Sequence, residues 1–307
     1  MSHNLCVLGI DAGGTFFKSC LVDSNGQVIQ DTSYKRRVDP DGEAGAILQD
    51  YAAVIRDGEE RAKKLGRRLL GIGISTPGPF DYEGKKSLMT HKLCGIYGLN
   101  LEREFAAYGV GVGLPLYFLH DSHAFLLGEH FAGEAKPYQN CAAVTIGTGT
   151  GFALIKNGRL LTSEQGGPYI SIYQMPIQGE TVEYFVSRSG MLRYYEKLLG
   201  GPAAPGIDVR ELELLALNEN DLLARAVFEH TGSILAQAIA DILKEQQTEC
   251  LVLGGQIAKG YPLMRESMGQ WLGEIASLKK VTVAHSIDFA AQIGAACMVY
   301  SKISGKY

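Results

Sequence analysis

The sequence predicts an α/β protein with two units, each built from a mixed β-sheet flanked by helices, and a cleft where the units meet. Short apolar runs typical of strands alternate with longer segments of helical periodicity. A motif of strand, glycine-rich turn and strand occurs near the start of the chain and again after residue 140. The two occurrences indicate a weak internal duplication.

The first half of the chain predicts strands around one helix. Apolar runs on both sides of Gly13 and Gly14 indicate a hairpin, and helical spacing appears later at Ile47, Tyr51 and Ile55. The predicted elements are strands at 5–10, 17–22, 28–33, 70–74 and 116–119 and a helix over 43–65.

The second half repeats the hairpin and then becomes mainly helical. The predicted elements are strands at 141–146, 151–156 and 250–253 and helical segments over 212–243 and 290–300. We therefore expect a smaller N-terminal domain at 1–119, which the C-terminal helix 290–307 joins, and a larger domain at 120–289.

Length and charge favour an enzyme-sized protein with a small-molecule partner. The chain has 307 residues, of which 46% are hydrophobic, so it is long enough for about two domains of ~150 residues. Its net charge of -4 comes without a basic run. This argues against nucleic acid and against an acidic membrane surface as partners.

The cysteines and the apolar segments predict a cytoplasmic location. Six cysteines are scattered along the chain and no two form a C-x-x-C pair, so we expect reduced core residues. The first residues show no signal-peptide pattern, and no apolar run reaches the ~18 residues that a membrane span needs.

Two glycine-rich turns are candidates for phosphate binding. In Asp11–Thr15, glycines let backbone N–H groups approach an anion, and Asp11 could hold a hydrated Mg²⁺ with nucleotide phosphates. The stretch Thr145–Gly151 repeats this arrangement between two apolar runs. Each turn taken alone is also compatible with an ordinary glycine-rich hairpin.

A third glycine motif follows the strand at 250–253. Gly254 and Gly255 lie at the expected start of a helix, where a base or ribose could lie on exposed backbone. In isolation this signal is weak. None of the three segments matches a G-x-x-x-x-G-K-[ST] loop or a dinucleotide-binding fingerprint.

The order and spacing of the three motifs resemble the superfamily of hexokinases, heat-shock chaperones and actin. Within it the chain is similar to ROK (repressor, ORF, kinase) sugar kinases. Four further segments support this resemblance: Gly71–Pro79, Lys92–Gly98, Leu119–Ala124 with Gly128–Glu129, and Ala290–Ala296. The resemblance implies two actin-like, ribonuclease H-like domains.

The resemblance also implies ATP-dependent phosphorylation of a hydroxyl group on a hexose or hexose derivative, with Mg²⁺ held through water by Asp11. It assigns to ATP and its phosphates Asp11, Gly13, Gly14, Thr15, Lys18, Gly147, Thr148, Gly149, Gly254 and Gly255. It assigns to the sugar Pro77, Gly78, Lys92, His120, Asp121, Glu164 and Glu183.

Asp121 is the candidate general base. It directly follows the apolar strand at 116–119, and open α/β sheets bind ligands beyond the carboxyl ends of their strands. Phosphoryl transfer needs a carboxylate that accepts the hydroxyl proton. The alternative is that Asp121 caps a helix beginning near Ser122.

The chain departs from the family pattern in two respects. Many members build a zinc site from a histidine and a cysteine-rich loop, but Gly167 replaces that histidine and 172–179 contains no cysteine. We therefore predict no structural zinc. His120 and Lys92 stand where the family has asparagines that contact the sugar, so the identity of the sugar is open.

Three other functions compete with a kinase. The family includes repressors with a DNA-binding domain ahead of the position of Leu5, where this sequence has four residues, so we expect no nucleic acid partner. A chaperone-like ATPase would not need the segment Gly71–Pro79. The main alternative is a non-catalytic protein that senses a sugar or nucleotide. By analogy with relatives we expect a homodimer.

Overall fold

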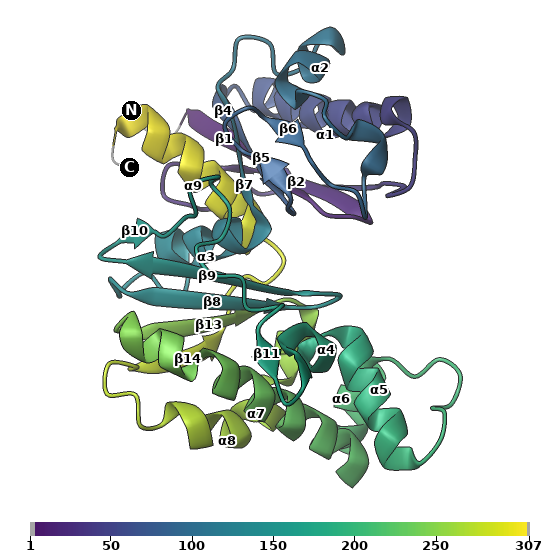
Figure 1. Cartoon of the computed structure of the whole chain (residues 1–307). Coiled ribbons are helices and arrows are strands. Elements are labelled where there is room, and N and C mark those ends of the chain that lie inside the picture. Colours follow the sequence, from purple (N-terminus) through teal and green to yellow (C-terminus); the bar gives the residue numbers. More distant parts are fainter. Residues whose placement is uncertain (1–3, 306–307) are drawn as a thin grey trace. The chain divides into compact units, whose positions relative to one another are not determined.

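The computed structural model describes residues 4–305, which divide into two compact units (Figure 1). The first unit comprises Met1–Lys136, Arg159–Tyr169 and Asp288–Tyr307, and the second comprises Pro137–Gly158 and Ile170–Ile287. Each unit is built around a mixed sheet flanked by helices, as the sequence predicts.

The sheet of the first unit has the strand order β3-β2-β1-β4-β7. Its strands are β1 (Leu5–Ala12), β2 (Phe16–Val22), β3 (Tyr34–Arg37), β4 (Arg68–Thr76) and β7 (Leu116–His120). β1 and β2 form the antiparallel hairpin, whereas β4 pairs in parallel with both β1 and β7. The carboxyl ends of β1, β4 and β7 therefore lie at the same edge of the sheet.

The predicted strand at 28–33 is wrong. Val28 forms only an isolated bridge with Val22, and the third strand comes later, at Tyr34–Arg37. The hydroxyl group of Thr32 accepts a hydrogen bond from the Leu21 amide and donates one to the Ile29 carbonyl. These side-chain bonds replace the ladder that a strand would need.

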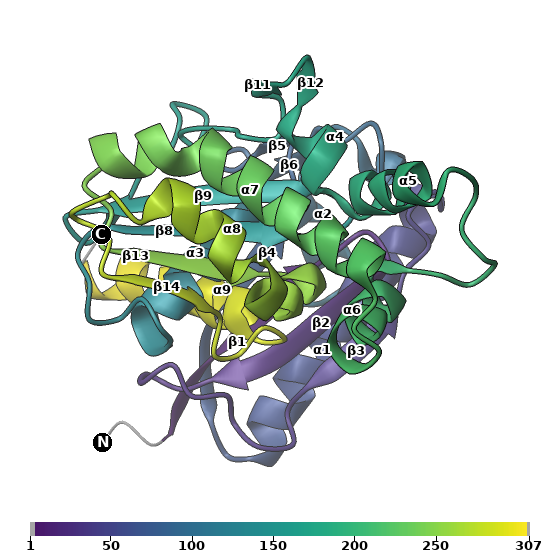
Figure 2. The same cartoon turned by 90° about the horizontal axis from the view of Figure 1, so that it is seen from below.

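Helices cover both faces of this sheet (Figure 2). α1 (Ala44–Lys64) buries Ile47, Tyr51 and Ile55 against the face that carries Leu8 and Ile10. The other face carries Val7 and Cys20, which pack with residues of α9 (Ala290–Ser304). Between β4 and β7 lie four short elements, which are β5 (Phe80–Asp81), β6 (Lys86–Ser87), η1 (Cys94–Ile96) and α2 (Leu101–Ala107).

α3 (Asp121–Ala132) packs along α9 at unusually close range. A Cβ atom on Gly128 would lie 2.0 Å from the carbonyl oxygen of Ala290, and one on Gly294 would lie 1.7 Å from that of Ala124. Only glycine allows the two backbones to approach this closely. Because α3 packs on α9, the first unit extends past Leu119, the predicted end of the N-terminal domain.

The second unit contains the strands β9, β8, β13 and β14 in that order. Their bounds are β8 (Cys141–Ile146), β9 (Thr150–Lys156), β13 (Cys250–Gly254) and β14 (Lys280–Val283). The two-residue strand β10 (Arg159–Leu160) belongs to a segment of the first unit. β8 and β9 form the second hairpin, and β13 is parallel to β8. The remaining elements are β11 (Pro176–Ile177), β12 (Glu180–Thr181), α4 (Val182–Val186), α5 (Arg188–Leu199), α6 (Val209–Asn218), α7 (Leu222–Glu245), η2 (Gln256–Gly260) and α8 (Tyr261–Leu272).

The predicted helical segment 212–243 consists of two helices rather than one. α6 ends at Asn218, and Asn220 has a φ of 54°. Asp221 then caps α7, because its carboxylate accepts a hydrogen bond from the Ala224 amide at 2.8 Å. Apolar periodicity alone does not reveal this break.

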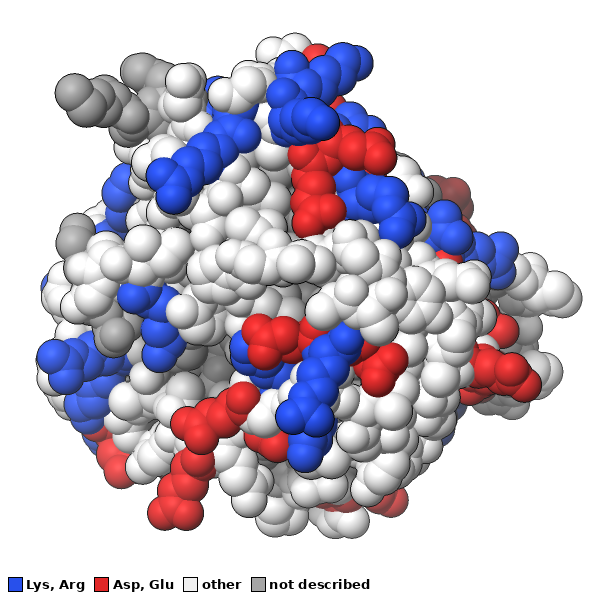
Figure 3. All heavy atoms as spheres, turned by 90° about the horizontal axis from the view of Figure 1, so that it is seen from above, with Lys and Arg blue, Asp and Glu red and all other residues white. Residues whose placement is uncertain are grey.

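The described residues contain no helix that is both long and apolar enough to span a membrane. On the face shown in Figure 3, basic and acidic side chains are interspersed.

Candidate active site

Asp11 lies at the end of β1, between neighbours on both adjacent strands. It is opposite Lys18 on β2 and Ser75 on β4, and the Ser75 hydroxyl donates to its carboxylate at 3.4 Å. Burial raises the pKa of Asp11 to about 6, although the positive charge of Lys18 acts in the opposite direction. Among residues 4–305, Asp11 forms no ion pair.

The first glycine turn follows Asp11 directly. The Gly13 amide donates to the Phe16 carbonyl at 3.1 Å, which closes the turn. Thr15 is exposed. A Cβ atom on Gly14 would lie 3.3 Å from Cδ of Lys92, so the Lys92 side chain lies against this turn. The turn is thus open on one side and bordered by a lysine.

Asp121 is the first residue of α3, immediately after β7. Its carboxylate accepts a hydrogen bond from the Ser122 amide at 2.6 Å and lies 3.0 Å from Nδ1 of His120. His120, not Asp121, occupies the N-cap position of α3. The side chain of Asp121 is 45% exposed, so a ligand can reach its carboxylate.

Opposing effects set the pKa of Asp121. Burial alone would raise it, but His120, Lys92 and a backbone amide together lower it below its ordinary value. The carboxylate is therefore ionised at neutral pH and can accept a proton. The charge of Asp121 also raises the pKa of Asp11, so the two carboxylates are close enough to interact.

Gly78 lies beside His120 and close to Tyr82. Gly78 precedes a cis peptide bond to Pro79. A Cβ atom on Gly78 would lie 3.4 Å from Cδ2 of His120 and 3.8 Å from the hydroxyl oxygen of Tyr82. That hydroxyl is buried and has no hydrogen-bond partner among residues 4–305.

Sequence reasoning did not identify Tyr82. Tyr82 belongs to no sequence motif. It lies near His120 because the chain after β4 folds back toward β7. The same is true of Ser75, whose contact with Asp11 depends on the pairing of β1 with β4.

Glu164 lies in a tight turn of the first unit. The Ser163 amide donates to the Gly167 carbonyl at 2.8 Å, and Gly166 has a φ of 79°. A Cβ atom on Gly166 would lie 3.3 Å from Cβ of Tyr82. The turn that carries Glu164 therefore packs on Tyr82, and Glu164 itself is exposed.

The second glycine turn, Gly147–Gly149, belongs to the second unit. The Arg188 amide donates to the Gly147 carbonyl at 2.8 Å, and Thr148 and Gly149 are exposed. Glu183 was predicted to contact the sugar, but the structure places its carboxylate beneath this turn. Its Oε2 accepts a hydrogen bond from the Thr150 amide at 2.9 Å.

The third glycine motif lies beside the second glycine turn. Gly254 pairs with Thr145, and a Cβ atom on Gly255 would lie 2.2 Å from the Ile146 carbonyl oxygen. Gly255 also has a φ of 81°, a conformation that favours glycine. The two motifs therefore follow the carboxyl ends of the neighbouring parallel strands β8 and β13.

The described residues hold no group of three or more histidine, cysteine or acidic side chains that could bind a metal ion by themselves. A hydrated cation that is also held by nucleotide phosphates needs fewer protein ligands. Asp11 fits this requirement, because its half-buried carboxylate is not ion-paired with a basic side chain in the described structure.

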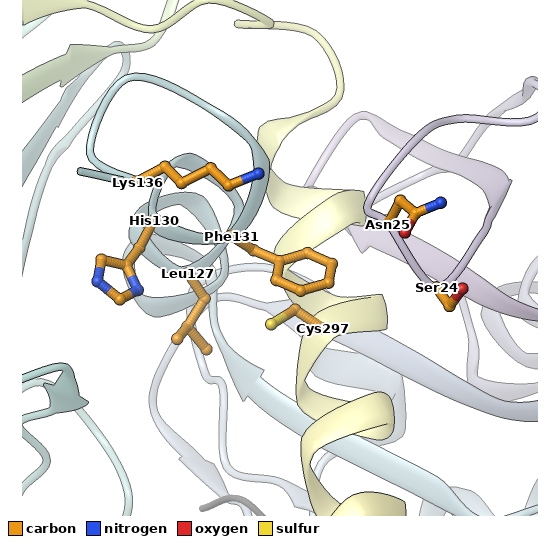
Figure 4. A pocket seen from close by; sticks show the side chains of 7 residues that line it. All are labelled: Ser24, Asn25, Leu127, His130, Phe131, Lys136 and Cys297. Atoms are coloured by element: carbon orange, nitrogen blue, oxygen red, sulfur yellow. The ribbon is translucent and has the colours of Figure 1, made fainter.

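A separate pocket of about 350 Å³ lies elsewhere in the first unit (Figure 4). It is lined by Ser24, Asn25, Leu127, His130, Phe131, Lys136 and Cys297. None of these residues belongs to the candidate site, which lies at the opposite, N-terminal end of α3.

The sequence profile of the ROK family matches residues 7–302. Glucokinase of Thermotoga maritima is 23% identical over 330 residues, covering 98% of this chain and 99% of the relative.

Solved ROK structures share the fold. A ROK family glucokinase from Streptomyces griseus, in complex with glucose and AMPPNP, has a TM-score of 0.78 at 21% identity and covers 95% of this chain and 98% of that one. A ROK family transcriptional regulator, a homologue of the E. coli MLC protein, has a TM-score of 0.83 at 20% identity, covering 99% and 80%. Since the family profile spans nearly the whole sequence, this chain belongs to the ROK family.

Proposed function

We propose that this protein transfers the γ-phosphoryl group of Mg-ATP to a hydroxyl group of a hexose or hexose derivative. The observation that carries the proposal is the position of Asp121. Its ionised, accessible carboxylate lies at the start of α3 and is electrostatically coupled to Asp11, which borders an open glycine turn. A base beside a phosphate site is what this reaction needs.

In the proposed reaction the sugar oxygen attacks the γ-phosphorus atom and ADP leaves. Asp121 accepts the hydroxyl proton as the new O–P bond forms. Oδ1 of Asp121 lies 3.0 Å from Nδ1 of His120 and accepts a hydrogen bond from the Ser122 amide at 2.6 Å. The base is therefore positioned before the substrate arrives.

The glycine turns of the two units are proposed to bind the nucleotide. Gly13, Gly14 and Thr15 offer partly exposed backbone and an exposed hydroxyl group close to Asp11 in the chain, and Lys18 adds a positive charge on the neighbouring strand. Mg²⁺, when bound with ATP, neutralises phosphate charge, and Asp11 is the residue that would hold it through water.

The second unit supplies the remaining nucleotide contacts in this proposal. Gly147, Thr148 and Gly149 form its phosphate turn, and Gly254 with Gly255 offers backbone for the adenosine. Glu183 supports the phosphate turn through the Thr150 amide, so we infer that it shapes the nucleotide site.

The sugar is proposed to bind beside Asp121 in the first unit. Gly78 lies beside His120, and Pro77 directly precedes it. Glu164 offers a carboxylate that can accept bonds from sugar hydroxyls. The glucokinase relative and the glucose complex of the Streptomyces griseus enzyme support a sugar as acceptor. His120 and Lys92 differ from the asparagines of the family pattern, so the preferred sugar can differ from glucose.

A second candidate is a protein that binds a sugar or nucleotide without turnover. The resemblance to a ROK transcriptional regulator and the exchanged residues at His120 and Lys92 favour it. Both candidates predict ligand binding, but only the kinase predicts a phosphorylated product.

A panel of hexoses, amino sugars and N-acylated amino sugars with Mg-ATP separates the candidates. We expect one sugar to raise the rate of ADP release at least tenfold above the rate with ATP alone. ADP release that no sugar changes would contradict the kinase assignment. Sugar binding without ADP release, measured by calorimetry, would support the sensor instead.

A further inference from the structure

We propose that Lys92 binds the transferred phosphoryl group and is a catalytic residue for the transfer, rather than a contact for the sugar. This inference rests on the proposed function. The family resemblance aligns Lys92 with a sugar-contacting position, but its surroundings in this chain point to the phosphate.

The stem of Lys92 lies against the first phosphate turn. Its Cδ atom is 3.3 Å, and its Cβ atom 3.9 Å, from the position that a Cβ atom on Gly14 would occupy. A larger residue at position 14 would therefore press on the lysine. The apolar part of the side chain is packed against the turn, and Lys92 as a whole is only half-buried.

The charge of Lys92 also acts on the proposed base. Its positive charge acts on Asp121 and contributes to the lowered pKa of that carboxyl group, after the larger effects of burial and His120. The stem of Lys92 therefore borders the phosphate turn, and its charge acts on the base. In an in-line transfer, the γ-phosphoryl group passes through this region.

Lys92 has no anionic partner of its own. Within residues 4–305 it forms no hydrogen bond and no ion pair within 4 Å, and it is only half-buried. An unpaired cation at the place where phosphate charge develops can stabilise the transition state directly. A neutral sugar offers this charge no comparable partner.

The backbone around Lys92 is held in place. Leu93 is fully buried in the left-handed region with a φ of 52°, and its amide donates to the Pro40 carbonyl at 2.6 Å. A Cβ atom on Gly95 would lie 2.5 Å from the Gly42 carbonyl oxygen. This anchored segment fixes the start of the Lys92 side chain beside the phosphate turn.

Kinetics of Lys92→Met test the assignment. Methionine keeps an apolar stem against Gly14 but removes the charge. We expect kcat to fall about 100- to 1,000-fold, with the KM for the sugar changed less than about threefold. Lys92→Arg, which keeps the charge, should restore part of kcat. A raised KM for the sugar with kcat retained would overturn the proposal.

Lys85→Met is the matched control. Lys85 lies nearby on the same connection, and its ammonium is already paired with Glu102. Its replacement should leave kcat and both KM values unchanged. An equal loss in Lys85→Met and Lys92→Met would mean that general charge, not position, is responsible.

Nucleotide binding gives a readout that does not depend on turnover. With Mg²⁺ present, the wild-type protein should bind AMPPNP more tightly than ADP, and Lys92→Met should reduce this ratio about tenfold. An unchanged ratio would overturn the proposal. If no sugar is phosphorylated but the ratio still falls, the kinase assignment fails and the phosphate contact of Lys92 stands.

Discussion

Asp11 and Asp121 are two carboxylates of one site whose pKa values move in opposite directions. Burial dominates at Asp11 and raises its pKa to about 6. At Asp121, His120, Lys92 and a backbone amide outweigh burial and lower the pKa. Asp121 is therefore suited to accept a proton, whereas Asp11 needs a cation before its charge is fully stabilised.

The raised pKa of Asp11 predicts how stability depends on pH. The folded protein holds the Asp11 proton more tightly than the unfolded chain, in which the pKa of this carboxyl group is 3.8. The contribution of Asp11 is therefore most favourable below pH 4 and is lost as the pH rises through about 6. Asp11→Asn has no carboxyl group at this position, so its free energy of unfolding does not fall for this reason as the pH rises.

We expect the stability difference between Asp11→Asn and wild type to shift in favour of the variant by about 2 kcal/mol between pH 4 and pH 7. Urea unfolding without Mg²⁺ or nucleotide measures it. Parallel stability curves for the two proteins across this range would contradict the assignment of the buried charge.

A comparison of Tyr82 with Tyr300 provides a second stability test. The Tyr82 hydroxyl is buried without a partner, whereas the Tyr300 hydroxyl donates to the Val22 carbonyl at 3.0 Å. Tyr82→Phe should leave the free energy of unfolding unchanged or raise it by about 1 kcal/mol, and Tyr300→Phe should lower it by about 1 kcal/mol. A loss in Tyr82→Phe as large as that in Tyr300→Phe would show that Tyr82 has a partner in the folded protein.

At the scale of elements, the crossing of α3 and α9 positions the start of α3. The two helices contact through Gly128 and Gly294, where no side chain separates the backbones. Asp121 begins α3, so a change in this crossing moves the base relative to Asp11 on β1. The glycines therefore support the geometry of a site that they do not contact.

Gly294→Ala tests this crossing. The new methyl group would lie 1.7 Å from the Ala124 carbonyl oxygen, so the helices must separate. We expect the free energy of unfolding to fall by about 3 kcal/mol. Gly45→Ala in α1 is the control, because a Cβ atom there meets nothing within 4 Å. It should be neutral or raise stability by up to about 1 kcal/mol. Equal effects in thermal or urea unfolding would show that close helix packing is not the cause.

The elements also show what sequence patterns predict well. Buried strands next to glycine turns, such as β1 and β8, were predicted nearly to the residue because apolar runs and glycines are strong local signals. The strand at 28–33 was wrong, and the helical segment at 212–243 was predicted without the break between α6 and α7. There, side-chain hydrogen bonds of Thr32 and Asp221 decide the local structure, and periodicity does not report them.

For the whole molecule, the order of motifs along the chain predicted the fold class and the ROK family. The structure brings Asp11, Lys92, His120 and Asp121 together in the first unit, although they are far apart in sequence. Sequence spacing could not predict the contacts of Ser75 and Tyr82, because they depend on strand register and on the path of the turn after β4. The hydrogen bond between the Glu183 carboxylate and the Thr150 amide likewise depends on the fold of the second unit, and the sequence did not predict it.

The most direct test of the whole account is phosphate-ester formation by wild type and Asp121→Asn, followed by ³¹P NMR with Mg-ATP and the preferred sugar. Asparagine keeps the shape of Asp121 but cannot accept the proton. We predict that the ester signal forms at least 100-fold more slowly in the variant, while ATP binds with unchanged affinity. Ester formation within tenfold of the wild-type rate would contradict the role of Asp121 as the base.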